Sequence, residues 1–386
     1  MAVATSGGRK RTRANGRPTS SASASAAPPD GTLLAPRIPP VPFEHEELVV
    51  RQGRRSGLHC VVAVHSTTLG PALGGVRLWG YPAVIDAARD ALRLATGMTY
   101  KAAAADLDLG GGKGVICVPP GIELAGRQRL DALLDFGALV ESLEGRYITA
   151  EDVGTSPEDL VAIHERTEHV TGLPPEHGGS GDPSPFTAAG VEAAIRACCR
   201  ERFGDPDLRG RRITVVGLGH VGSPLARRLA AAGAELVVTD IAPRRRELAA
   251  ELGAEWVGPD GAMLTECEVL APCALGGAID AGNVDRLRAE IVCGSANNQL
   301  ADESLAARLA ERRILYAPDF IANAGGLIHV YMEIKRYSEE RAAELVAGIE
   351  ETLARVLVAA SARGITPLDA ARELARERLE ATAAVA

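Results

Sequence analysis

The chain has 386 residues, a length that predicts two domains, and its 46% hydrophobic and 24% charged residues are typical of a soluble folded protein. No stretch approaches the roughly 18 uninterrupted apolar residues of a membrane-spanning helix. The N-terminus lacks the apolar core of a signal peptide. We therefore expect neither a membrane protein nor a secreted one, and we expect a cytoplasmic chain.

Charge and metal-ligand patterns exclude further classes. The net charge is −8, but residues 1–36 carry a local +4, which leaves −12 for the remaining body. A body this acidic, without a basic stripe, argues against nucleic-acid binding. The seven cysteines show no CxxC spacing and the histidines show no HxH or HExxH spacing. We therefore expect reduced, buried thiols and no metal site.

The first 36 residues differ in composition from the rest. They are rich in Ser, Ala, Gly and Pro and hold five Arg or Lys residues against one Asp. Such a segment cannot bury a core, so we expect a disordered, solubilising basic tail. Contact with polyanions is the alternative. Ordered structure is expected from about Ile38.

The next part of the chain mixes strands and helices. Runs of β-branched residues predict strands over residues 47–50, 59–65 and 147–150. Apolar residues at helical spacing predict helices over residues 84–97 and 130–143. This half is therefore expected to form an α/β domain.

A Gly/Ser/Pro break at residues 178–185 predicts a hinge, and strand–helix alternation follows it. Such alternation is typical of a parallel, doubly wound sheet. The expected strands are residues 212–216, 235–239, 269–271 and 291–293, the expected helices between them are residues 224–232 and 244–252, and two C-terminal helices are expected at residues 339–362 and from Pro367 onward.

A GxGxxG motif follows the first strand of this alternation, in residues 215–222 (VVGLGHVG). Gly217 allows a tight turn, Gly219 lets a pyrophosphate approach the backbone, and Gly222 lets the helix pack against the strand. The motif opens a predicted helix, as a dinucleotide site requires. We therefore predict a dinucleotide-binding loop here.

The second strand ends at Asp240, near the distance expected for an acid that binds the ribose diol. A carboxylate there would repel a 2′-phosphate, which favours NAD over NADP. Arg244, Arg245 and Arg246 argue the other way, because a nearby Arg accommodates that phosphate, unless they form only a solvated helix start. NAD is the expected cofactor.

Two lysines stand in unusual segments of the first half. Lys101 ends the sequence TYK, Lys113 lies within GGGKG, and Asp152 follows a predicted strand. GGGKG is not a phosphate-binding P-loop, since Lys113 is followed by Gly rather than by Ser or Thr. In a dry pocket, a neighbouring lysine would lower the pKa of Lys113 toward neutrality and make it a usable base. From spacing alone, one structural and one surface lysine fit equally well.

Several ordered motifs resemble one family, the amino-acid dehydrogenases that act on leucine, valine, phenylalanine and glutamate. The likeness runs from about residue 44 to residue 380 and leaves the tail uncovered. The matching segments are residues 69–77 (LGPALGGVR), 97–101 (GMTYK), 109–113 (LGGGK), 147–154 (YITAEDVG), 271–274 (APCA), 294–299 (GSANNQ) and 323–326 (NAGG).

The resemblance implies an α/β fold with an N-terminal substrate domain, a doubly wound, Rossmann-like NAD-binding domain and a cleft between them. The expected boundaries are residues 37–175 for the substrate domain and residues 176–360 for the NAD-binding domain. Residues 361–386 are expected to pack back on the substrate domain.

The resemblance also implies residue roles. Lys101, with the backbone at Gly74 and Gly75, would bind the substrate carboxylate. Lys113 would be the general base, and Asp152 would shuttle protons. Asn297 would hold the amine and the nicotinamide end. The remaining implied cofactor-binding residues are Thr187, Gly217, Gly219, His220, Val221, Gly222, Asp240 and Ala274.

The substrate side chain is implied to be apolar. Glutamate-specific members carry a Lys where this chain has Leu73, and Ala150, Leu327 and Val330 match the other side-chain contacts of the branched-chain enzymes. A glutamate carboxylate buried there unpaired would cost several kcal/mol. His329 departs from the Asn expected at its position; it either turns away from the pocket, the interpretation we prefer, or contacts it.

The resemblance therefore implies reversible, NAD-dependent oxidative deamination of leucine, valine or isoleucine to the 2-oxo acid, ammonia and NADH. A phenylalanine dehydrogenase is the alternative. A non-catalytic NAD- or amino-acid-binding protein is a third hypothesis, against which Lys101, Lys113 and Asp152 argue, because a binding protein needs no proton shuttle. We expect a homo-oligomer without nucleic-acid or membrane partners.

Overall fold

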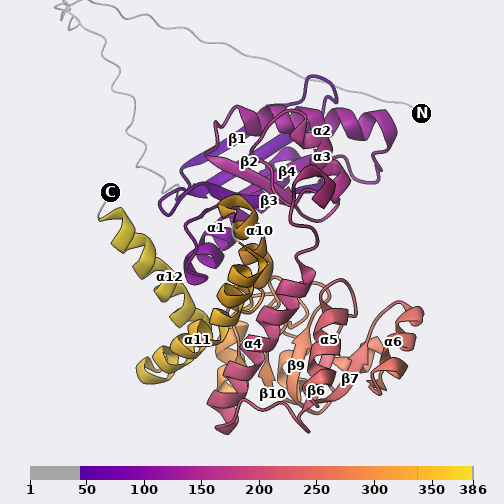
Figure 1. Ribbon diagram of the computed structural model, residues 1–386, viewed down its shortest axis with the longest axis vertical. Coiled ribbons are helices and arrows are strands. Elements are labelled where there is room, and N and C mark those ends of the chain that lie inside the picture. The colour runs from indigo at the N-terminus through magenta and orange to yellow at the C-terminus, as the bar shows by residue number, and fades with distance from the viewer. Residues whose placement is uncertain (1–43, 337, 385–386) are drawn as a thin grey trace, which may run out of the picture. The chain divides into compact units, whose positions relative to one another are not determined.

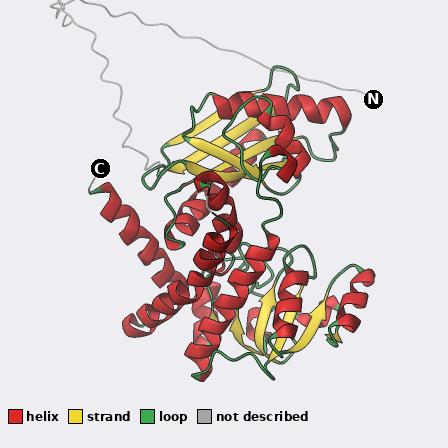
Figure 2. Ribbon diagram, viewed as in Figure 1, coloured by secondary structure: helices red, strands yellow, loops and turns green. Residues whose placement is uncertain are grey.

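The computed structural model describes residues 44–336 and 338–384. The predicted basic tail and the predicted start of order near Ile38 lie outside these residues. The described residues form two β-sheets with helices packed around them (Figure 2). This α/β architecture confirms the predicted fold class.

The first sheet has five strands in the order β1-β2-β4-β3-β5. β1 pairs with β2 and β2 with β4 in antiparallel fashion, whereas β3 lies parallel to both β4 and β5. Its strands are β1 (Glu47–Gln52), β2 (His59–Ser66), β3 (Ala72–Gly80), β4 (Gly110–Val118) and β5 (Tyr147–Glu151), and its helices are α1 (Val84–Ala104), α2 (Gly126–Glu141) and α3 (Pro157–His164).

Helices cover both faces of this sheet, as the side-chain alternation of β2 shows. Val62 and Val64 belong to a core cluster with residues of α2 and α3, such as Phe136. Val61 and Ala63 belong to another cluster with alanines of α1. Because successive side chains of a strand point to opposite faces, one continuous apolar run serves both layers.

Helix α1 is longer than the sequence pattern predicts. It continues past Gly97 to Ala104, so Lys101 lies in its last turn. Gly97 is exposed, and the cost of one glycine, about 1 kcal/mol, is offset by burial of Thr99 and of residues 102–104. The predicted end of the helix at residue 97 was wrong because tertiary packing outweighed local propensity.

The glycine-dense segment 109–115 contains most of β4, a fully buried strand. A Cβ on Gly111 would lie 2.1 Å from the Thr99 backbone N, and one on Gly112 would lie 2.6 Å from the Tyr147 ring. The glycines therefore let α1 and an aromatic ring pack closely on the strand. Ligand approach to the backbone does not by itself explain them.

The second sheet has six strands, all parallel, in the order β11-β10-β9-β6-β7-β8. Figure 1 labels its four middle strands, β10, β9, β6 and β7. The predicted strands 212–216 and 235–239 are confirmed residue for residue. The strands are β6 (Arg212–Val216), β7 (Glu235–Thr239), β8 (Glu255–Trp256), β9 (Cys267–Pro272), β10 (Ala289–Val292) and β11 (Leu315–Tyr316).

The remaining helices surround or follow this sheet. They are α4 (Ser184–Phe203), α5 (Gly222–Ala231), α6 (Arg246–Glu251), α7 (Pro259–Ala262), α8 (Leu305–Glu311), α9 (Asp319–Ala322), α10 (Gly325–Lys335), α11 (Glu339–Arg363) and α12 (Pro367–Ala383), with short 3-10 turns at Pro175–His177, Pro243–Arg245 and Val284–Arg286. In the described part of the chain, none of the helices is long and apolar enough to cross a bilayer.

The two C-terminal helices end and begin as the sequence predicts. α11 stops at Gly364, whose φ of 66° is a left-handed conformation that glycine adopts freely. α12 then packs on α1, where the Arg378 guanidinium donates to the carbonyls of Ala102, Ala103 and Leu107. The chain thus returns to the helix that carries Lys101.

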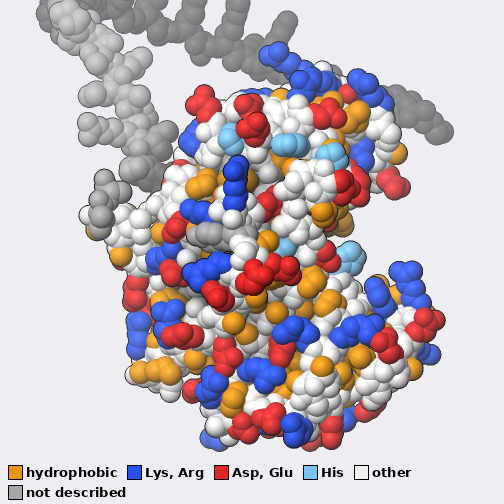
Figure 3. All heavy atoms as spheres, in the orientation of Figure 1, with side chains coloured by type: hydrophobic (Ala, Val, Ile, Leu, Met, Phe, Trp, Pro, Cys, Tyr) orange, Lys and Arg blue, Asp and Glu red, His pale blue; other side chains and the backbone are white. Residues whose placement is uncertain are grey.

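The cysteines are reduced, and the surface carries charges of both signs. All seven cysteines are free, and all but the half-buried Cys273 are buried. On the face drawn in Figure 3, Lys and Arg side chains are interspersed with Asp and Glu side chains.

Candidate active site

Lys113 and Asp152 form a buried ion pair. Lys113 lies in β4 and is 5% exposed, and its Nζ is 2.9 Å from Asp152 Oδ2. Asp152 directly follows β5, which β3 separates from β4. Burial lowers the pKa of Lys113, and the Asp152 charge opposes this shift. The pair is therefore suited to proton exchange.

Lys101 reaches the same region from the last turn of α1. Its Nζ donates to Asn297 Oδ1 over 3.3 Å. Burial lowers the pKa of Lys101 to about 8, the Asp319 carboxylate opposes the shift, and the charge of Lys113 adds to it. The two amines therefore interact electrostatically, as the dry-pocket interpretation requires.

Asn297 is held in place by a residue to which the sequence assigned no role. Asn323 Nδ2 donates to Asn297 Oδ1 over 2.8 Å and to the Ser295 carbonyl over 3.1 Å. Asn323 is buried, whereas Asn297 is exposed. Asn323 belongs to the NAGG motif that carries the family resemblance, but that motif did not indicate a contact with Asn297.

Arg77 is a second residue without an assigned role. Its Nε donates to Asp152 Oδ2 over 2.9 Å, and its Nη1 donates to Asp90 Oδ2 over the same distance. Arg77 ends the LGPALGGVR motif, which had pointed to Gly74 and Gly75 instead. Only the strand order, which sets β3 beside β5, brings Arg77 to Asp152.

Gly74 and Gly75 lie in β3 between its two parallel neighbours. A Cβ on Gly74 would lie 1.8 Å from the Gly112 carbonyl oxygen, and one on Gly75 would lie 2.3 Å from the Glu151 carbonyl oxygen. Both glycines are thus required by close packing of the strands. Their backbone contact with a substrate carboxylate stays a prediction.

Three of the four predicted pocket residues share one apolar cluster. Leu73 and Leu327 are buried in it, and Val330 packs against it. Ala150 lies on β5, paired with Gly75. Met98 and Ile148, which the pattern did not single out as pocket residues, also pack against this cluster.

His329 faces the segment that precedes α4. Its Nδ1 is 3.3 Å from Ser180 Oγ, and its ring lies 4.5 Å from the Phe186 ring. Burial lowers its pKa, and the nearby Glu333 carboxylate opposes the shift. Glu333 itself accepts hydrogen bonds from the backbone of Gly172 and Ser180.

The glycine-rich loop has the geometry that a pyrophosphate requires. Gly217 has a φ of 100°, which favours glycine, and a Cβ on Gly222 would lie 1.9 Å from the Gly217 carbonyl oxygen. A Cβ on Gly219 would meet no atom within 4 Å, so open space lies beside the loop. The loop opens α5, whose first N–H groups favour an anion. These residues fit a dinucleotide.

Asp240 closes the same loop. Its Oδ2 accepts from the Leu218 backbone N–H and its Oδ1 from the Ala242 N–H, both over 2.7 Å. Each carboxylate oxygen accepts more than one hydrogen bond, so ribose hydroxyls are not excluded by these contacts. The side chain is therefore fixed in orientation at the end of β7.

The other predicted cofactor residues surround this loop and α4. A Cβ on Gly217 would lie 2.8 Å from Ala274 Cβ, so Ala274 borders the loop. The exposed His220 lies near Glu151, since its charge opposes the rise that burial causes in the pKa of Glu151. Thr187 Oγ1 donates to the Pro183 carbonyl over 3.1 Å. Val221 directly precedes α5.

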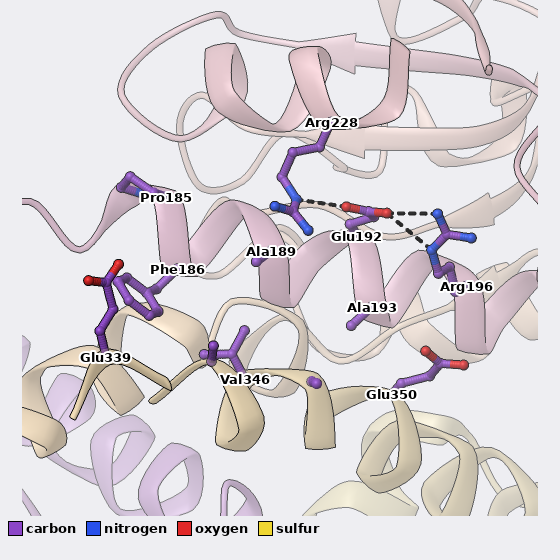
Figure 4. A pocket seen from close by; sticks show the side chains of 12 residues that line it. Pro185, Phe186, Ala189, Glu192, Ala193, Arg196, Arg228, Glu339, Val346 and Glu350 are labelled. Atoms are coloured by element: carbon purple, nitrogen blue, oxygen red, sulfur yellow. Dashed lines mark hydrogen bonds and ion pairs between the residues drawn. The ribbon is translucent and has the colours of Figure 1, made fainter. Parts of the chain in front are cut away.

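The described residues hold no metal-ligand cluster, and the hollow between α4 and α11 lies away from the site. Within the described residues, no group of three or more His, Cys, Asp or Glu side chains is arranged to hold a metal ion. A hollow of about 430 Å³ lies between α4 and α11 and contains the ion pair of Glu192 and Arg228 (Figure 4). None of the predicted site residues lines this hollow.

Family models cover most of the chain. The dimerisation-domain model of the Glu/Leu/Phe/Val dehydrogenases matches residues 43–169, and the glutamate/leucine/phenylalanine/valine dehydrogenase model matches residues 244–385. The NAD-binding domain of the D-isomer-specific 2-hydroxyacid dehydrogenases matches residues 192–275, which include the glycine-rich loop.

Individual relatives agree with these matches. A leucine dehydrogenase of Thermoactinomyces intermedius is 46% identical over 88% of this chain and 92% of its own length. A valine dehydrogenase of Streptomyces virginiae is 43% identical over 87% and 94%. The crystal structure of L-tryptophan dehydrogenase from Nostoc punctiforme superposes with a TM-score of 0.77 at 38% identity, covering 88% of this chain and 96% of that one.

Proposed function

Because the chain belongs to the glutamate/leucine/phenylalanine/valine dehydrogenase family, we propose that it catalyses the reversible, NAD-dependent oxidative deamination of branched-chain L-amino acids. Leucine, valine or isoleucine is converted to its 2-oxo acid and ammonia. The observation that carries this proposal is the pair of interacting amines, Lys101 and Lys113, with Asp152 bound to one of them.

The site residues divide the reaction between anchoring and proton transfer. Lys101, with the backbone at Gly74 and Gly75, binds the substrate carboxylate and so fixes the α-carbon. Neutral Lys113 accepts a proton from the substrate amine and later from the water that adds to the imino carbon, and Asp152 exchanges these protons. Water supplies the carbonyl oxygen, and the amino nitrogen leaves as ammonia.

The proposed cofactor site is supported by the loop geometry. Gly217, Gly219 and Gly222, with the backbone at His220 and Val221, would bind the pyrophosphate, and Asp240 would bind the ribose diol. Thr187, Ala274 and Asn297 would border the nicotinamide. When bound, NAD would accept the hydride that leaves the substrate α-carbon.

An apolar substrate is supported by Leu73, Leu327 and Val330, which share one apolar cluster. A second substrate carboxylate beside the fully buried Leu73 would be desolvated at a cost of several kcal/mol. The leucine and valine dehydrogenases among the relatives support the same class. The likeness to a tryptophan dehydrogenase keeps an aromatic substrate, such as phenylalanine, as the second candidate.

The domain limits and the assembly belong to the same proposal. Of the residues that the structure describes, those up to 175 are assigned to the substrate domain and those from 176 to 360 to the NAD-binding domain, and those from 361 to 384 are assigned to the former. This is supported by the contacts of Arg378 with α1. A homo-oligomer is supported by the match to a dimerisation-domain model. The cytoplasm is the location proposed for it.

Initial rates of NADH formation test this function. We expect turnover with leucine, valine and isoleucine to exceed turnover with phenylalanine, tryptophan and glutamate, and NAD to be preferred over NADP. Lys113→Ala removes the base and is expected to lower kcat by about 10²–10⁴-fold. Lys335→Ala, at a more exposed lysine of α10, is the control and is expected to retain activity.

Different outcomes contradict different parts. No NADH with any amino acid would exclude the dehydrogenase assignment. Faster turnover of an aromatic substrate would overturn the branched-chain preference alone. A fully active Lys113→Ala enzyme would remove the assigned base.

A further inference from the structure

A guanidinium group joins the proposed proton-transfer pair to a second carboxylate. Arg77 bridges Asp152 and Asp90 with two hydrogen bonds of 2.9 Å. Tyr81 Oη donates to the same Asp90 oxygen over 2.7 Å. The side chains of Arg77, Asp90 and Asp152 are only 17–20% exposed, so water screens these contacts weakly.

The fold fixes this bridge from three elements. Arg77 lies on β3, paired with Val115 of β4, two residues beyond Lys113, while the preceding Val76 pairs with Glu151 of β5. Asp90 lies on α1, the same helix that carries Lys101. A rigid strand therefore holds Arg77 between the proton-transfer pair and the substrate-anchoring helix.

Arg77 and Lys113 use the same oxygen of Asp152. Both nitrogens lie 2.9 Å from Oδ2. Among the described residues, Oδ1 has no hydrogen-bond partner. Two cations thus fix the carboxylate by one oxygen.

Within the ion-pair network that contacts Lys113, the charges balance only when Arg77 is present. With Lys113 neutral, the cations Arg77 and Arg93 match the anions Asp90 and Asp152. Without Arg77, one negative charge is left unmatched, and protonation of Lys113 would neutralise it. A protonated Lys113 cannot act as a base.

We propose that Arg77 is a positioning residue of the reaction, which holds Asp152 against Lys113 and keeps Lys113 neutral by balancing the Asp152 charge. This inference rests on the proposed function. It is supported by the pKa shifts, since the Arg77 charge lowers the pKa of Lys113 and, after the Lys113 charge, that of Asp152.

Other titratable and charged groups face the same cluster and are unchanged by substitution of Arg77. Lys101 approaches from α1, and Asp319 acts on Lys101 from α9. Tyr81 and Asp90 interact electrostatically with Arg77. Tyr147 and Glu151 interact electrostatically with Asp152.

The test compares the pH profile of kcat/KM in three variants. Arg77→Gln removes the charge and is expected to move the acidic limb to higher pH by about one unit, the usual effect of losing a close charge. At pH values below the limb, the kcat/KM of Arg77→Gln is then expected to be about tenfold lower than that of the wild-type enzyme, and the difference disappears at higher pH. Arg77→Lys keeps the charge and is expected to shift the limb less. Arg89→Gln, at an arginine of α1 with 74% side-chain exposure, is the control and is expected to shift nothing.

A second readout needs no turnover. Acetylation by acetic anhydride proceeds through the neutral amine, so its rate at Lys113, followed by mass spectrometry, reports the same ionisation. The chain offers few competing sites, since its lysines are Lys10, Lys101, Lys113 and Lys335. The acetylation midpoint of Lys113 is expected to rise in Arg77→Gln by the same amount as the kinetic limb.

The two readouts separate the two proposals. A wild-type chain without turnover, but with a midpoint that rises in Arg77→Gln, would contradict the dehydrogenase function and retain the coupling. An active enzyme whose limb and midpoint stay unchanged in Arg77→Gln, with rates lowered equally at all pH values, would show a merely structural arginine and overturn the inference.

Discussion

Lys101 and Lys113 carry the same side chain in different surroundings. Lys113 contacts a carboxylate directly, whereas Lys101 donates to a neutral amide, that of Asn297. Burial lowers the pKa of both amines, but only Lys113 has an anion in contact to share its proton. This difference is what divides anchoring from proton transfer in the proposed mechanism.

The Lys101 pKa of about 8 predicts a pH-dependent substrate affinity. Below that value Lys101 is charged and attracts the substrate carboxylate; above it the charge is lost. The KM for leucine should therefore rise by up to about tenfold per pH unit on the alkaline side, while NAD binding stays level. Steady-state kinetics with each substrate varied in turn measure this.

Lys101→Met provides the matched comparison. Its KM is expected to be high and independent of pH, whereas Lys335→Met should follow the wild-type curve. A KM that stays flat through pH 8 in the wild-type enzyme would contradict the anchoring role of Lys101.

Glycines have different structural roles in β4 and in the loop after β6. In β4 they make room for α1 and for the rings of Tyr147 and Phe136, so their absent side chains are replaced by the protein's own atoms. In the loop after β6, Gly219 borders open space instead. The same residue type thus serves packing in one element and ligand approach in the other.

Gly112→Ala tests the packing purpose. The added Cβ would lie 2.6 Å from the ring of Tyr147, which is fully buried and cannot move aside. Overpacking of this kind is expected to lower the free energy of unfolding by about 1–3 kcal/mol. Urea unfolding followed by circular dichroism measures the change.

Gly348→Ala in α11 is the control with the opposite sign. A Cβ there meets nothing within 4 Å, and the residue is exposed. The change should raise helix stability by roughly 1 kcal/mol. Equal effects of the two substitutions would refute the packing explanation.

For the molecule as a whole, the C-terminal helix connects distant parts of the chain. α12 follows all strands of the second sheet, yet Arg378 satisfies carbonyls at the end of α1, next to the first sheet. The Ala102 and Ala103 carbonyls also accept from the backbone N–H groups of Leu107 and Asp106, so Arg378 adds a further donor to each. Arg378 therefore stabilises the turn from which Lys101 extends.

Arg378→Met removes the side-chain hydrogen bonds to these carbonyls and is expected to cost about 0.5–1.5 kcal/mol of unfolding free energy. It should also raise the KM for the amino acid more than that for NAD, because the loosened turn carries Lys101. Thermal unfolding and steady-state kinetics measure the two effects.

Glu377→Met replaces an exposed side chain of the same helix and should change stability by less than about 0.5 kcal/mol. If both variants behave alike, the Arg378 contacts do not stabilise the end of α1.

The sequence by itself determined the features that local pattern encodes. Strand–helix alternation predicted the doubly wound sheet, and β6 and β7 appear where β-branched runs predicted them. The GxGxxG motif and Asp240 identified a loop whose parts are neighbours along the chain or at the ends of adjacent strands. The ordered motifs identified the family, which the comparisons confirm.

Only the tertiary structure decided how the site is supported. Arg77 and Asp152 are 75 residues apart, and Lys101 and Asn297 are 196 apart. No periodicity encodes such contacts, because they arise from strand order and helix packing. The same holds for the extension of α1 past Gly97 and for the glycines of β4, whose environment comes from segments distant in the sequence. The sequence motifs thus identify the reactive side chains, whereas the charges and hydrogen bonds around them depend on the tertiary structure.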